Sequence, residues 1–106
     1  MIEIKQTDAG KNIYRLEATD SDTGNVIGFA ELKGVEKPVP VFFCKVEDSY
    51  MGKKIGSEML KKTVAYAKSA EKEGIFVRYD GNVRAKMMLK KQGFHLYTKE
   101  IAMLEL

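Results

Sequence analysis

The sequence predicts a mixed α/β (α+β) domain in which short strands alternate with two helices. Segments in the first half alternate apolar and polar side chains, which is typical of half-buried strands. Two later segments repeat apolar residues every three or four positions, which is typical of amphipathic helices. Because the chain has 106 residues, these elements fit one domain over residues 1–106.

The composition is that of a globular protein. Hydrophobic residues make up 44% of the chain and charged residues 31%, which argues against a disordered chain. The net charge of +3 is smaller than nucleic-acid-binding domains usually concentrate on one face. The charge therefore does not favour a nucleic-acid partner.

Cysteine content and hydropathy indicate a cellular compartment. Cys44 is the only cysteine, so the chain has no internal disulfide and no cysteine-based metal site, and we expect no bound metal. The start, MIEIKQTD, lacks the apolar core of a signal peptide, and no segment is apolar for long enough to cross a membrane. We therefore expect a soluble protein of a reducing compartment, the cytoplasm.

The first half of the chain predicts four strands. MIEIK alternates as a half-buried strand does, and residues 12–32 predict a hairpin, because two alternating segments flank the turn sequence DSDTGN. GVEKPVP interrupts regular structure because proline cannot join a central ladder. VFFCKV, residues 41–46, predicts a strand whose first residues are buried on both faces.

The second half predicts two helices and three more strands. The apolar face of the first helix consists of Met59, Leu60, Thr63, Val64 and Ala67. We expect Gly74 to end this helix. IFVRYD then predicts a strand, and Ala85, Met88 and Leu89 mark one face of a second helix that Gly93 ends. FHLY and IAMLEL predict the last two strands.

The stretch SYMGKKIGSEML, residues 49–60, combines two glycines with a lysine pair between a strand and a helix. A helix N-terminus has unpaired N–H groups and a positive dipole end, and glycine lets backbone N–H groups approach an anion. The spacing is neither that of a P-loop nor that of a dinucleotide-binding fingerprint. The stretch predicts an anion-binding turn, and a strand-to-helix turn with solvated lysines is the alternative.

Two segments resemble the signatures of one family. VEDSYMGKKIGSEML resembles the acyl-CoA-binding motif [Q/R]-x-x-G-x-[G/A] of the GNAT superfamily N-acetyltransferases. NVRAKMMLKKQGF resembles the second signature, with Asn82, Ala85 and Gly93-Phe94 at the family spacing. The resemblance covers residues 26–106 and implies a mixed, mostly antiparallel sheet flanked by two main helices.

The resemblance also implies a cofactor and a site. Acetyl-CoA would be the co-substrate, and an amine-bearing acceptor would attack its thioester. The strand end, Cys44, Lys45 and Val46, would bind the pantetheine arm through its backbone, and an N–H near Val46 would polarise the thioester carbonyl. The pyrophosphate would lie on the loop N–H groups of Met51, Gly52, Lys53, Lys54, Ile55, Gly56 and Ser57. Asn82 and Leu89 would border the thiol end.

Three residues depart from the family pattern, and they leave the acid and base chemistry open. Met51 replaces the usual Gln or Arg, Lys54 replaces the first motif glycine, and Leu89 replaces a tyrosine that often protonates the thiolate. A lysine-like amine with a pKa of about 10.4 must lose a proton before it attacks. Glu47 is the candidate base, and a solvated loop carboxylate is its alternative role. Tyr79 and Tyr97 are the remaining phenols near the site.

Only QTDAGK, residues 6–11, separates the first two strands, where the family usually has two helices over the amine substrate. We therefore expect an open acceptor side that suits an exposed amine, for example on a protein. It also suits a homodimer in which a second chain completes the site.

Three functions follow from these observations. The leading hypothesis is an acetyl-CoA-dependent N-acetyltransferase. The second is a catalytically weak or inactive CoA-binding module of the same fold, since Met51, Lys54 and Leu89 depart from the pattern. The third, which the small net charge favours least, is a small nucleic-acid-binding protein, suggested by the lysine pairs and the slight positive charge.

Overall fold

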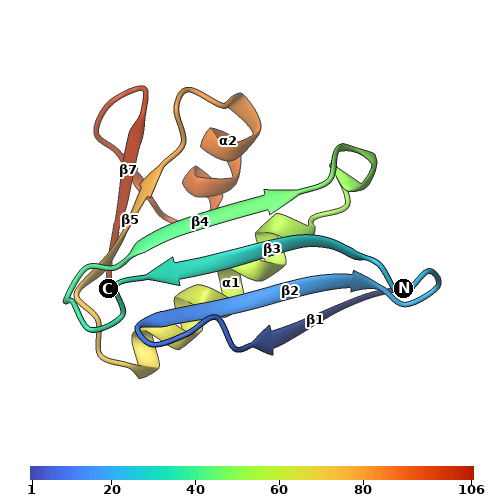
Figure 1. Cartoon of the computed structure of the whole chain (residues 1–106). Helices are drawn as coiled ribbons and strands as arrows, with labels where there is room; N and C mark the ends of the chain where they lie inside the picture. The colour runs from blue at the N-terminus through green and yellow to red at the C-terminus, as the bar shows by residue number, and fades with distance from the viewer.

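The computed structural model describes all 106 residues and contains one seven-stranded sheet. The strands are β1 (Ile2–Thr7), β2 (Ile13–Asp20), β3 (Val26–Lys33), β4 (Val41–Val46), β5 (Gly74–Arg78), β6 (His95–Leu96) and β7 (Ile101–Glu105). The helices are α1 (Ile55–Ser69) and α2 (Val83–Lys91), and a short 3-10 helix, η1 (Asp48–Tyr50), precedes α1. Figure 1 shows the sheet in front of α1, with α2 beside β5.

The sheet has the order β1-β2-β3-β4-β5-β7-β6. All neighbouring strands are antiparallel except β4 and β5, which are parallel. This confirms the predicted mixed, mostly antiparallel sheet with two helices. The hairpin predicted over residues 12–32 is β2 and β3, in a register that pairs Leu16 with Ala30. Residues 8–12 join β1 to β2 without a helix, as expected.

Helix α1 covers one face of the sheet. Of the predicted apolar face, Met59, Leu60, Thr63 and Ala67 are buried. Val64 is half-buried against the core, and Ile55 is buried as well. The Thr63 hydroxyl donates to the Met59 carbonyl at 2.8 Å, so this polar residue is satisfied inside the core.

The predicted end of α1 at Gly74 is wrong. The helix ends at Ser69, and Glu71 reverses the chain in the left-handed conformation, with a φ of 59°. Gly74 instead begins β5, where an added Cβ would lie 2.7 Å from the Leu104 carbonyl oxygen of β7. Glycine is required there because the two backbones approach closely, and not because the chain turns.

The prediction that β4 begins buried on both faces is also wrong. Phe42 is 3% exposed beneath α1, whereas its neighbours Val41 and Phe43 are 43% and 49% exposed on the opposite face. No helix lies in front of β1–β4 in Figure 1. Because only one face is covered, the strand alternates between buried and exposed positions.

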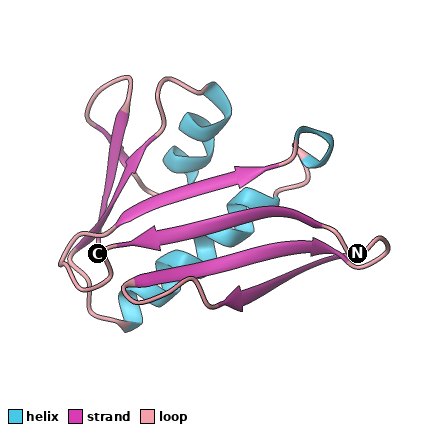
Figure 2. Cartoon of the chain, in the orientation of Figure 1, coloured by secondary structure: helices cyan, strands magenta, loops and turns pink.

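Strands β4 and β5 separate soon after they begin. They pair only at Val41 with Phe76 and at Phe42 with Val77. Figure 2 shows β4 and β5 running apart beyond this point, with α2 above the gap. The end of β4, from Phe43 to Val46, therefore has no strand partner on the side of β5, and its backbone groups on that side are free for a ligand.

Candidate functional site

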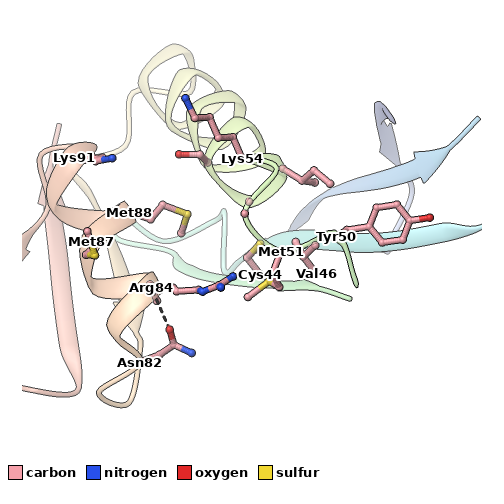
Figure 3. Close-up of a pocket in the computed structure, with 15 residues that line it drawn as sticks. Cys44, Val46, Tyr50, Met51, Lys54, Asn82, Arg84, Met87, Met88 and Lys91 are labelled. Atoms are coloured by element: carbon pink, nitrogen blue, oxygen red, sulfur yellow. Dashed lines mark hydrogen bonds between the residues drawn. The ribbon is translucent and has the colours of Figure 1, made fainter. Parts of the chain in front are cut away.

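A cavity of about 430 Å³ lies where the end of β4, the start of α1 and one side of α2 meet. Figure 3 shows its lining side chains converging from these three elements. Of the residues singled out from the sequence, the cavity brings together Cys44, Val46, Met51, Gly52, Lys54, Ile55, Gly56, Ser57 and Asn82. It is also lined by Tyr50, Arg84, Ala85, Met87, Met88 and Lys91. Lys45, Glu47, Lys53 and Leu89 do not line it.

The start of α1 offers a run of unused hydrogen-bond donors. The first intrahelical bond runs from the Glu58 N–H to the Lys54 carbonyl, and no N–H group of residues 52–57 has an acceptor within the protein. Met51 differs, because its N–H already donates to the Asp48 carbonyl at 3.1 Å. The free donors, together with the positive end of the helix dipole, form a site for an anion.

The backbone of this loop bends in two places to present its donors. Gly52 has a φ of 81°, and Lys54, directly before the helix, has a φ of 63°. The left-handed region suits glycine at Gly52 and is strained at Lys54, which carries a Cβ. The Lys54 side chain is exposed and lines the cavity, so it adds positive charge beside the free N–H groups.

Cys44 forms part of the floor. Burial raises the pKa of the Cys44 thiol to about 12, so the thiol stays protonated and behaves as a small apolar group. A Cβ at Gly56 would lie 3.7 Å from the Cys44 sulfur and 3.6 Å from the Met88 sulfur. Gly56 therefore keeps a space between α1, β4 and α2 that a larger side chain would fill.

Helix α2 forms the opposite wall. The Asn82 Oδ1 accepts the Ala85 N–H at 2.9 Å and caps the helix. This bond leaves the Asn82 side-chain NH₂ group free at the cavity edge. Leu89 is 1% exposed and packs in the core, whereas Met88, one residue earlier, faces the cavity. The wall is apolar in its middle and cationic at Arg84 and Lys91.

The candidate acid and base residues lie outside the cavity. Glu47 is exposed just past β4, and its backbone N–H donates to the Ile27 carbonyl at 2.8 Å. Tyr79 is buried and its hydroxyl donates to the Thr98 carbonyl at 2.6 Å, so this proton is already engaged. Tyr97 is 56% exposed beside His95 on the short β6 edge, away from the cavity.

Tyr50 is a cavity residue that the sequence did not reveal. Its hydroxyl donates to the Asp20 carboxylate at 2.6 Å, which links η1 to the end of β2. This bond raises the pKa of Tyr50 and lowers the pKa of Asp20. Lys53 lies over the Tyr50 ring, 5.3 Å from its centre. The two partners are 30 residues apart, and no local pattern connects them.

Arg84 and Lys91 are cavity residues that the sequence analysis did not single out, although their spacing of seven residues on one helix could have indicated them. They lie two helical turns apart on the side of α2 that carries Met88.

The protein has no group of three or more His, Cys, Asp or Glu side chains that is placed to hold a metal ion. No helix is long and apolar enough to cross a membrane.

Comparison with known proteins identifies the family. The model of the acetyltransferase (GNAT) family matches residues 4–94. This match spans most of the chain, which therefore belongs to the GNAT family of acetyltransferases, a family of enzymes. No individually curated protein matches the sequence.

Solved structures with the same fold include several acetyltransferases. A GNAT-family acetyltransferase from Staphylococcus aureus Mu50 is 17% identical with a TM-score of 0.77, over 90% of this chain and 68% of that chain. The IAA acetyltransferase from Bacillus cereus ATCC 14579 is 16% identical with a TM-score of 0.81, over 100% of both chains. The ribosomal-protein-S5-alanine acetyltransferase from Vibrio fischeri is 15% identical with a TM-score of 0.77, over 89% of this chain and 62% of that chain. At these identities the similarity establishes the fold alone.

Proposed function

We propose that this protein transfers an acetyl group from acetyl-CoA to the amine of an exposed acceptor. The observation that carries the proposal is the run of free N–H groups over residues 52–57 at the start of α1. These donors border a cavity that reaches the unpaired end of β4. A pyrophosphate on the loop and a pantetheine arm along the strand end would use both features at once.

The cavity residues match the parts of such a ligand. The middle of the cavity is lined by apolar side chains, among them Val46, Ile55 and Met88, which suit the pantetheine chain. Lys54 lies beside the free N–H groups of the loop, where the phosphate groups would sit. Asn82, at the start of α2, borders the end where the thioester would lie.

The chemistry is direct attack. The neutral amine nitrogen forms a bond to the thioester carbonyl carbon, the C–S bond breaks, and CoA leaves as a thiolate. The amine gives up its proton to water or to a base. A backbone N–H at the end of β4, near Val46, would stabilise the oxyanion. A thiolate with a parent pKa of about 8.5 leaves without a dedicated acid, so Leu89 is compatible with slow turnover.

The acceptor side is open. Residues 8–12 form a simple loop between β1 and β2, and no helix covers the front of β1–β4. This arrangement supports an exposed amine, such as one on a protein or a polyamine, over an enclosed small molecule. A second copy of the chain could complete the same side, which is why a homodimer belongs to the proposal. The free thiol of Cys44 is compatible with the cytoplasm, where we place the protein.

A catalytically inactive CoA-binding module is the second candidate, because Glu47, Tyr79 and Tyr97 all lie outside the cavity. Single-turnover and steady-state assays separate the two. We expect CoA binding by calorimetry and transfer of radiolabelled acetyl to a lysine-bearing peptide or to spermidine at pH 9. CoA binding without transfer to any amine would leave the binding module, and the absence of CoA binding by the folded protein would reject both.

A further inference from the structure

Strand β1 forms an open edge of the sheet. It pairs with β2 along all six of its residues without a bulge, and no strand lies on its other side. Figure 1 shows β1 at the border of the sheet, with no further strand outside it. Natural proteins usually protect such an edge with a very short strand, a proline or a bulge. The opposite edge, β6, has only two residues, whereas β1 carries none of these devices.

The backbone groups that β1 leaves unused belong to every second residue. The Met1 carbonyl accepts the Ser21 N–H at 2.9 Å, so the backbone of residue 1 faces β2. This direction alternates along an antiparallel strand. The N–H and C=O groups that face out of the sheet are therefore those of Ile2, Ile4 and Gln6. Another strand can form a ladder with β1 only through these three residues.

The charged side chains of β1 select one register for such a ladder. Ile4 packs against the core, so its neighbours Glu3 and Lys5 lie on the opposite, open face of the sheet. Both are exposed, and the Lys5 Nζ lies 3.6 Å from the Glu3 Oε2. A twofold axis at Ile4 sets Glu3 of one copy opposite Lys5 of another. A shift by two residues in either direction sets two glutamates or two lysines opposite each other, which is destabilising.

We propose that β1 pairs antiparallel with β1 of a second copy of this chain, with Ile4 opposite Ile4 and Glu3 opposite Lys5. Ile2 then lies opposite Gln6, so all the outward-facing backbone groups of the strand are used. The two sheets become one, with both α1 helices on the same side and both open faces on the other. That these joined faces are the acceptor side rests on the proposed function. The pairing itself does not, because β1 contributes no residue to the cavity.

Sedimentation velocity at low salt, without CoA, tests the pairing between about 1 µM and about 500 µM protein. We expect a reversible dimer in the upper part of this range, because a single strand pair is a small interface. Glu3→Lys and Lys5→Glu each set like charges opposite at two places, so each should weaken the dimer at least about tenfold. Glu36→Lys and Lys62→Glu make the same charge changes at exposed positions away from β1 and should stay within about twofold.

A mixture of the two β1 variants tests the register. In a mixed dimer, the lysines of Glu3→Lys face the glutamates of Lys5→Glu, so the mixture should recover affinity to within about threefold of the unmodified protein. Circular dichroism of each variant verifies that it is folded. Under mild oxidation, Ile4→Cys should form a disulfide between copies much faster than Ile2→Cys, because only position 4 lies opposite itself.

Two results would overturn the proposal. A protein that stays monomeric up to about 500 µM would leave this edge to a strand of another protein. A dimer that Glu3→Lys and Lys5→Glu weaken no more than Glu36→Lys and Lys62→Glu do would show that the copies meet elsewhere. Because these measurements contain no CoA, either result would leave the proposed acetyl transfer to its own assays.

Discussion

The Tyr50 hydroxyl donates a 2.6 Å hydrogen bond to the Asp20 carboxylate. Asp20 ends β2, and Tyr50 ends η1, with only Met51 between it and the loop of residues 52–57. Asp20 is itself fixed, because its carboxylate also accepts the Asp22 N–H at 2.9 Å. The hairpin turn therefore anchors the segment that leads into the candidate CoA site.

Tyr50→Phe removes this anchor and keeps the ring. We expect a lower thermal midpoint and several-fold weaker CoA binding, because the loop loses its fixed starting point. Tyr97→Phe is the control, since the Tyr97 hydroxyl makes no hydrogen bond within the protein and is exposed. If the two variants have equal thermal midpoints and equal CoA affinities, the contact between Tyr50 and Asp20 does not position the loop.

The same pair predicts a pH window. The pKa of Asp20 is lowered in the folded state, so its contribution to stability exists above the ordinary aspartate pKa of about 3.9 and disappears as the pH falls. The pKa of Tyr50 is raised, so its contribution exists below about 10 and disappears as the pH rises. The stability difference between the unmodified protein and Tyr50→Phe should therefore be largest between these limits. A difference that grows below pH 3 in urea titrations would contradict this account.

Lys54→Gly should stabilise the fold and weaken the site. Lys54 has a φ of 63°, and relief of this strain should raise the free energy of unfolding by about 0.5–1 kcal/mol. Lys53 has no positive φ, so Lys53→Gly should lower it by up to about 1 kcal/mol. Urea denaturation of both variants measures whether the free energy of unfolding rises or falls. Calorimetry should show weaker CoA binding by Lys54→Gly, since a cavity cation is lost.

Cys44 should be unreactive in the folded protein. A pKa of about 12 leaves about three thousandfold less thiolate at neutral pH than a free cysteine with a pKa of about 8.5. We expect iodoacetamide to modify Cys44 more than about a hundredfold more slowly in buffer than in 8 M urea. Mass spectrometry over time gives both rates, and similar rates in the two conditions would show that the thiol is neither buried nor neutral.

Glu47→Gln should change kcat by less than about threefold, because Glu47 is exposed and does not line the cavity. Without a tuned base, the neutral fraction of the amine limits the rate and rises about tenfold per pH unit below the amine pKa. The pH–rate profiles of both proteins should therefore run parallel. A loss of more than about a hundredfold in kcat, with unchanged CoA affinity, would instead identify Glu47 as the general base.

Local patterns predicted most of the fold. The hairpin of β2 and β3 follows from alternation and turn residues, and the buried face of α1 follows from helical spacing. Gly93 ends α2 as predicted, with a φ of 89° after the last helical turn. These features depend on residues close in sequence, which is why they could be read from the chain alone.

The sequence predictions were wrong where the environment of a residue depends on parts of the chain that are distant in sequence. Exposure of Phe43 depends on whether any helix covers its face, and the need for glycine at Gly74 depends on the backbone of β7. On α2, a shift of one residue rotates a side chain by about 100°, so spacing alone did not separate Leu89 in the core from Met88 in the cavity. The partnership of Tyr50 with Asp20 likewise exists only in the folded chain.

The central claim is that the free N–H groups of residues 52–57 bind the pyrophosphate of CoA. An NMR titration of the ¹⁵N-labelled protein with CoA tests it most directly, because each amide reports its own hydrogen bond. We predict large, saturable downfield shifts for amides of residues 52–57, and a much smaller shift for Met51, whose N–H already donates to Asp48. Saturable binding that leaves the amides of residues 52–57 unmoved would contradict the account.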